Sequence, residues 1–161
     1  MERVAIFVTD SGGTYETAQD LRESLEQRPA ARGEIHCEVI DDSAMERIAT
    51  DSKNWDVIII VDSFLREPAM PLPHPMPKVP SIAEACENAI AWLMLIKEAN
   101  PKQRVMITTT AIMPEFSQTY YDACFENGAE AIFEYVYDVN HIISQILNAQ
   151  VIRIFYPTAC K

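Results

Sequence analysis

Apolar and polar residues alternate in blocks along the chain, and these blocks predict strands and helices in turn. Residues 4–8, 57–61 and 105–107 are continuous apolar runs, which are typical of strands buried on both faces of a parallel sheet. Residues 34–39 and 131–136 mix polar with apolar positions, as strands at the edges of a sheet do. The pattern therefore predicts three central strands flanked by two edge strands.

Helices are predicted between these strands. Apolar residues recur at helical spacing in residues 14–27, 81–98 and 115–126, and again after Asp138, which can cap a last helix. Gly128 follows the third of these segments, as glycine commonly does at a helix end. Strands that alternate with helices indicate an α/β fold: a doubly wound, five-stranded parallel sheet of order 2-1-3-4-5 with helices on both faces.

Polar residues collect where the predicted strands end. Thr9, Asp10 and Ser11 follow the first strand, Asp62 follows the third, and residues 108–110 follow the fourth. In this fold ligands bind beyond the carboxyl ends of the strands, next to the switch between strands one and three. We interpret the cluster as a binding site, present or former. The alternative is that these side chains only cap backbone groups.

The net charge and the cysteine content indicate which kinds of partner and which cellular location to expect. The chain has 161 residues and a net charge of −11, so nucleic acid and anionic membrane surfaces should repel it. No apolar run approaches the ~20 residues that a membrane span needs. The four cysteines lie far apart without a CxxC motif, which favours reduced thiols and a cytoplasmic location.

Most of the chain resembles the receiver domain of two-component response regulators. The likeness runs through the first-strand end at Asp10, residues 37–44, residues 55–62, the Thr110-Ala111 pair and residues 128–138. It implies that Asp62 is the candidate phosphoacceptor, that Asp10 and Asp62 bind Mg²⁺, and that Thr110 belongs to the switch pair. A histidine kinase or another signalling protein would then be the partner.

The resemblance fails at residues that carry the receiver's chemistry. Thr9 replaces the first of two acids, Tyr135 replaces the lysine near the end of the domain, and Val136 replaces the proline that follows it. The spacing from Asp56 would also put the phosphoacceptor at Val61, one residue before Asp62. We therefore predict a pseudo-receiver that acts through protein–protein interaction and not as an enzyme, with weak or absent phosphorylation.

A flavodoxin-like protein is the alternative. Residues 9–18 resemble the flavodoxin phosphate loop, in which Thr9, Ser11 and Thr14 would cradle the phosphate of flavin mononucleotide (FMN). Asp10 would repel that phosphate, and no Gly-x-Gly-Asp turn follows the fourth strand. The alternative implies an FMN-binding electron-transfer protein.

Two segments lie outside the five-stranded pattern. Residues 63–80 form a proline-rich insertion, which either presents a partner surface or wraps its own domain. Residues 150–161 form an extension of the domain at 1–149, and part of it is apolar and aromatic. This tail adds an edge strand to the sheet, packs on its own domain, or packs on a second subunit in a homodimer.

Overall fold

The structure is a computed structural model of the 161-residue chain. It describes residues 1–8, 15–40, 55–62, 89–109, 114–134, 139–148 and 154–156.

All strands of the sheet are parallel. They are β1 (Glu2–Val8), β2 (Ile35–Ile40), β3 (Val57–Asp62), β4 (Arg104–Thr109), β5 (Ala131–Glu134) and β6 (Ile154–Tyr156). Their order is β2-β1-β3-β4-β5-β6. The predicted order of the first five strands is confirmed.

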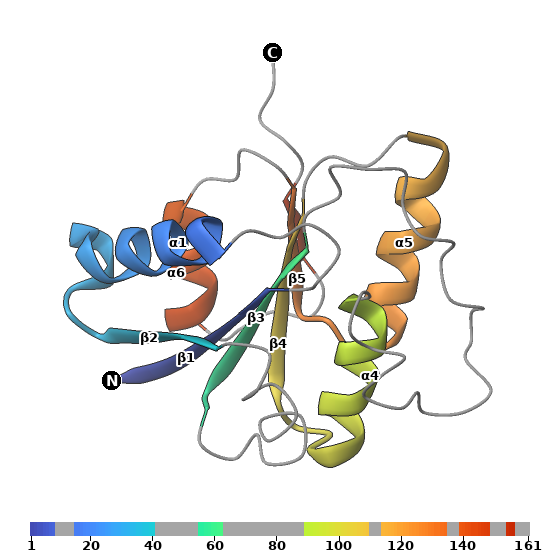
Figure 1. The fold of residues 1–161 in the computed structure, drawn as a ribbon, viewed down its shortest axis with the longest axis horizontal. Coiled ribbons are helices and arrows are strands. Elements are labelled where there is room, and N and C mark those ends of the chain that lie inside the picture. The colour runs from blue at the N-terminus through green and yellow to red at the C-terminus, as the bar shows by residue number, and fades with distance from the viewer. Residues whose placement is uncertain are drawn as a thin grey trace.

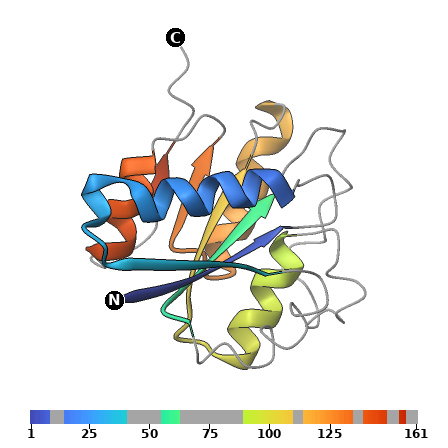
Figure 2. The ribbon, with the colours of Figure 1, turned by 60° about the vertical axis from the view of Figure 1, so that its left-hand side comes forward.

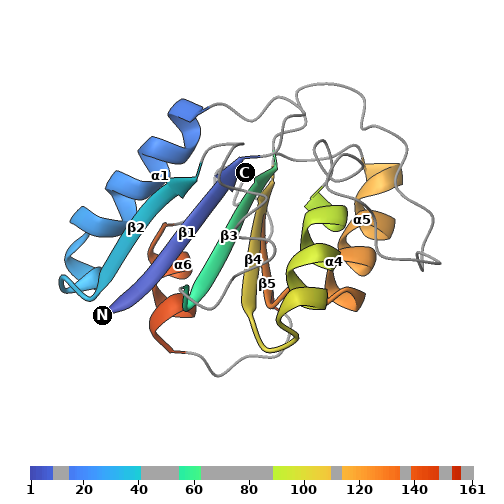
Figure 3. The ribbon, with the colours of Figure 1, turned by 60° about the horizontal axis from the view of Figure 1, so that its bottom comes forward.

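Helices cover both faces of this sheet. They are α1 (Tyr15–Gln27), α4 (Ala89–Ala99), α5 (Pro114–Glu126) and α6 (Val139–Leu147), with a short 3₁₀ helix, η1 (Pro29–Ala31). Helices α1 and α6 lie on one face, and α4 and α5 lie on the other (Figures 1 and 3). None of the described helices is long and apolar enough to cross a membrane.

The side chains of the central strands divide into two cores because they alternate between the two faces. Val4, Ile6 and Ile59 face α1 and α6, while Phe7 and Ile60 face α4 and α5. All five are fully buried, which explains the continuous apolar runs in the sequence.

Two features differ from the sequence-based expectation. The fifth strand is not an edge, because β6 pairs with it through Ala131↔Ile154 and the two residues that follow. Asp62 lies within β3, and Thr108 and Thr109 lie within β4, so these residues belong to the strands and do not follow them. The predicted helix at 81–98 corresponds to α4, and its first part, residues 81–88, lies outside the described residues.

Candidate functional site at the carboxyl edge of the sheet

The carboxyl ends of four neighbouring strands lie level with one another. Val8 of β1 pairs with Val61 of β3, Val61 pairs with Thr108 of β4, and Thr108 pairs with Phe133 of β5. The segments that leave these strands therefore start from one edge of the sheet. This is the edge at which doubly wound folds bind their ligands.

One residue further along, the backbone register brings Asp62 next to Thr109. Asp62 ends β3, and its Cα partner is Thr109, the last residue of β4. Adjacent strands are about 4.8 Å apart, so these two residues are direct neighbours at the edge. The sequence reasoning selected Thr110, which follows Thr109 and lies outside the described residues.

Glu134 is the acidic residue that the sequence reasoning missed at this edge. It ends β5, and its Cα partner is Thr109. From the sequence alone, Glu134 was interpreted only as one of the polar positions in the predicted strand at 131–136. A residue-by-residue alignment of the strand ends is the signal that would have found it, since β3, β4 and β5 all end at this level.

Thr108 adds a buried hydroxyl beneath the edge. The residue is 2% exposed, and its Oγ1 has no hydrogen-bond partner among the described residues. A buried hydroxyl without a partner costs free energy, so this group requires an explanation. Its position one residue below the strand end puts it next to the candidate site.

The remaining candidates lie in segments outside the described residues. They are Thr9, Asp10, Ser11 and Thr14, which follow β1, and Thr110, which follows β4. Asp10 is two residues beyond Val8, and Tyr135 comes directly after β5. Within the described part of the chain, no group of three or more histidine, cysteine, aspartate or glutamate residues could hold a metal ion. Carboxylates such as those of Asp10 and Asp62 are nevertheless the oxygen ligands that Mg²⁺ prefers.

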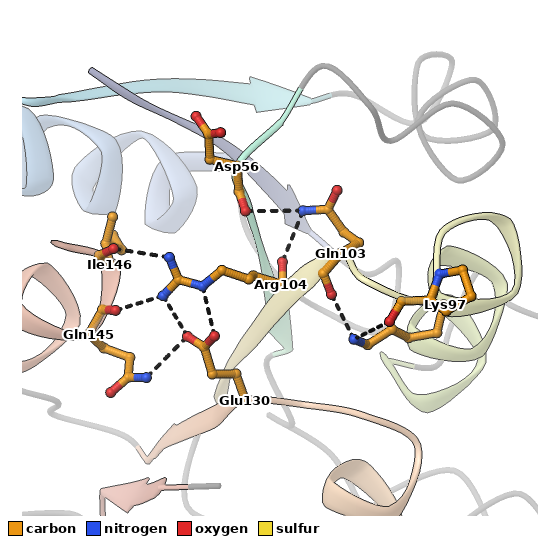
Figure 4. A network of polar contacts seen from close by, with 8 residues as sticks. Asp56, Lys97, Gln103, Arg104, Glu130, Gln145 and Ile146 are labelled. Atoms are coloured by element: carbon orange, nitrogen blue, oxygen red, sulfur yellow. Dashed lines mark hydrogen bonds and ion pairs between the residues drawn. The ribbon is translucent and has the colours of Figure 1, made fainter. Parts of the chain in front are cut away.

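A polar network lies at the amino ends of the strands, opposite the candidate site, and is shown in Figure 4. Arg104 Nε donates to Glu130 Oε1 at 2.7 Å, and Arg104 Nη2 donates to Glu130 Oε2 at 2.8 Å. The same guanidinium donates to the carbonyl oxygens of Gln145 and Ile146 at 2.8 and 3.1 Å. These carbonyls belong to the last turn of α6, where they lack helical partners.

The physical role of this network is to fix α6 to the sheet. The hydrogen bonds that Arg104 donates to Glu130 raise the pKa of Arg104, against the opposing effect of burial. Nearby, burial lowers the pKa of Lys97, whose Nζ donates to the carbonyl oxygen of Gln103 at 2.7 Å. Every strong donor in the network has an internal partner, so we assign it a structural role.

Comparison with solved structures identifies the architecture. A LuxR family DNA-binding response regulator from Silicibacter pomeroyi superposes with a TM-score of 0.59 at 16% identity, over 98% of this chain and 99% of that one. A response regulator receiver domain protein from Clostridium thermocellum reaches 0.60 at 15% identity, over 92% and 94%. This chain has the receiver fold.

A third receiver-fold structure was solved in an activated form. It is the BeF₃-activated DrrB receiver domain, with a TM-score of 0.56 at 15% identity over 92% of this chain and 96% of that one. No protein-family model matches the sequence, and no curated protein matches it. At these identities the likeness establishes the fold, while the chemistry has to be argued from the chain's own residues.

Proposed function

We propose that this protein is a pseudo-receiver, a signalling domain that acts by binding other proteins and whose Asp62 is phosphorylated weakly or not at all. The observation that carries the proposal is the combination of a receiver fold over nearly the whole chain with Tyr135 directly after β5. The receiver resemblance calls for a lysine at that position. On this proposal the protein is not an enzyme and works in the cytoplasm.

The chemistry of phosphoryl transfer supports the proposal. Transfer to an aspartate needs Mg²⁺ to neutralise the phosphoryl oxygens and an ammonium group to pair with one of them. Asp10 and Asp62 would supply two carboxylates, while Thr9 stands where the resemblance calls for another acid. Loss of one electrostatic partner at such a site costs about 2–4 kcal/mol of transition-state stabilisation. Two losses leave phosphorylation slow.

The strand register supports Asp62, and not Val61, as the candidate phosphoacceptor. Asp62 is the residue at the end of β3, next to Thr109, whereas Val61 is 3% exposed and belongs to the core beneath α1 and α6. An apolar side chain in a core offers no oxygen to a phosphoryl group. We expect any residual Mg²⁺ binding by Asp10 and Asp62 to be weak.

The decisive experiment tests whether Asp62 is phosphorylated in the wild type and whether restoring the two missing charged side chains enables it. Wild-type protein is treated with acetyl phosphate, or with beryllofluoride, in the presence of Mg²⁺, and modification of Asp62 is followed by mass spectrometry or fluorine NMR. We expect no stoichiometric modification. The double variant Thr9→Asp, Tyr135→Lys should gain it, because it restores both missing charges, and adding Asp62→Asn should abolish the gain. Stoichiometric, Mg²⁺-dependent modification of the wild type would mean an active receiver.

The proposal also assigns a surface for binding the partner. The proline-rich segment 63–80 is the proposed partner surface, since proline restricts its backbone and lowers the entropy lost on docking. Replacing residues 68–80 with a glycine-serine linker should then weaken partner binding while the domain stays folded.

For the FMN alternative, titration of FMN fluorescence should reveal no binding tighter than about 1 μM, because Asp10 repels the phosphate.

A further inference from the structure

Strand β2 forms one edge of the sheet. It pairs with β1 on one side, and no other described strand pairs with it on the opposite side. The carbonyl oxygen of Glu34 accepts a hydrogen bond from the N–H of Glu2 at 2.7 Å, which fixes the direction of the ladder. Because backbone groups alternate along a strand, the N–H and C=O groups of Ile35, Cys37 and Val39 point away from β1.

A carboxylate from α1 occupies the middle of this outer row. The N–H of Cys37 donates to Glu26 Oε1 at 2.9 Å. The same oxygen lies 3.6 Å from His36 Nδ1, and His36 Nε2 lies 3.6 Å from Glu38 Oε1. Figure 2 shows α1 running alongside β2, which is how a helix side chain reaches the edge. Glu26 therefore accepts the hydrogen bond that a neighbouring strand would otherwise accept.

The two faces of β2 differ sharply in character. Ile35 and Cys37 are buried beneath α1 and α6. Glu34, His36 and Glu38 are exposed on the other face. A strand added to this edge would place alternate side chains beside the two exposed glutamates. With the net charge of −11 on the chain, this edge favours cationic side chains.

We propose that the outer edge of β2 binds an extended basic segment of a partner protein by strand addition, and that Glu26 holds the Cys37 N–H until that segment arrives. Lysine or arginine residues at alternate positions of the segment lie beside Glu34 and Glu38. Their backbone exchanges hydrogen bonds with Ile35, Cys37 and Val39. The proposal is independent of Asp62 phosphorylation, so the two can fail separately.

Backbone-methylated peptides test the hydrogen-bonding part of the proposal. The probe is a fluorescent, end-capped peptide of alternating lysine and valine, and its binding is measured by anisotropy. The lysine side chains lie on the face of β2 that carries Glu34 and Glu38. In an antiparallel complex the valine N–H groups then point at β2, and in a parallel complex the lysine N–H groups do. One peptide is N-methylated at its valines and a second at its lysines. We expect binding to be lost where the methylated N–H groups point at β2 and to be kept where they point away. Equal binding of both methylated peptides would leave only charge attraction and overturn the proposal.

Matched charge variants test the location. Glu34→Gln with Glu38→Gln should weaken binding about fivefold through the loss of two cross-strand charge pairs. Asp20→Asn with Glu23→Gln makes the same change in net charge on the exposed side of α1, and should alter binding by less than about twofold. Equal weakening by both pairs would overturn the assignment to β2. So would dimerisation of Glu26→Ala without peptide, in sedimentation, because the occupant of the edge would then be a second copy.

Discussion

At the scale of single residues, Cys37 shows how one environment shapes both reactivity and stability. The residue is 1% exposed, and burial together with the neighbouring Glu26 carboxylate raises the pKa of its thiol from 9.0 to about 12, against a smaller opposing effect of Arg22. A thiol in this state stays protonated and unreactive at neutral pH. Cys37 therefore acts as an apolar core residue whose charge is suppressed by the fold.

This environment predicts a loss of stability at alkaline pH. In the unfolded chain the thiol ionises above its ordinary pKa of 9.0, while the folded protein keeps the proton up to about 12. The unfolded state then binds fewer protons, so the free energy of unfolding falls as pH rises through this window. Between pH 9 and about 10.5 the wild type should lose roughly 1.5 kcal/mol more than Cys37→Ala, since the loss approaches ~1.36 kcal/mol per pH unit only once the unfolded thiol is mostly ionised. Parallel urea titrations of both proteins check this, and equal losses would contradict it.

The candidate site marks the limit of residue-scale prediction from sequence. Asp62 was predicted because it ends an apolar run, and a run boundary is a local signal. The pairing of Asp62 with Thr109, and of Thr109 with Glu134, depends on how strands distant in sequence align. No local pattern encodes that alignment. The roles of Asp10 and Thr110 depend on loops and stay predictions.

At the scale of elements, helix ends follow local chemistry closely. The predicted end of α5 at Gly128 is confirmed: Gly128 has a φ of +101°, and its N–H donates to the carbonyl of Phe125 at 3.1 Å. The link between Glu26 and Cys37 has no such signal, because it joins a helix to an edge strand through a side chain. Elements are thus readable from the sequence, whereas the contacts between them are not.

The two described glycines at positive φ give a matched pair of substitutions. A Cβ at Gly128 would lie 2.7 Å from Lys97 Cε, and Lys97 is held by its bond to Gln103, whereas a Cβ at Gly33 would meet nothing within 4 Å. Backbone strain alone costs a non-glycine residue about 1–2 kcal/mol at such a φ. We expect Gly33→Ala to cost about 1 kcal/mol, and Gly128→Ala about 2–3 kcal/mol because Lys97 must also move. Urea unfolding measures both, and equal costs would mean that Lys97 yields freely.

At the scale of the whole molecule, the sequence predicted the order of the first five strands, while the sixth strand was one of several alternatives for the tail, and the pairing of β6 with β5 confirms it. Continuous apolar runs identified β1, β3 and β4 as central strands, because only strands covered on both faces lack polar positions. The mixed pattern of β5 suggested an edge, yet β6 covers that edge with a strand of only Ile154–Tyr156. A segment this short carries too few alternating positions to be distinguished from a tail by pattern.

The sixth strand leads to a prediction about the integrity of the domain. Removing residues 150–161 should leave β1 to β5 folded, since these five strands pair with one another in the order β2-β1-β3-β4-β5 without β6. It uncovers the backbone of β5, whose lost hydrogen bonds are worth about 1 kcal/mol each, so we expect Tm to fall by about 5–10 °C. The open edge should also promote concentration-dependent association, which sedimentation detects. Removing only residues 157–161 spares β6 and serves as the control, with little expected change in Tm. If the two truncations behaved alike, β6 would contribute nothing to stability, and residues 1–149 would be a complete folding unit.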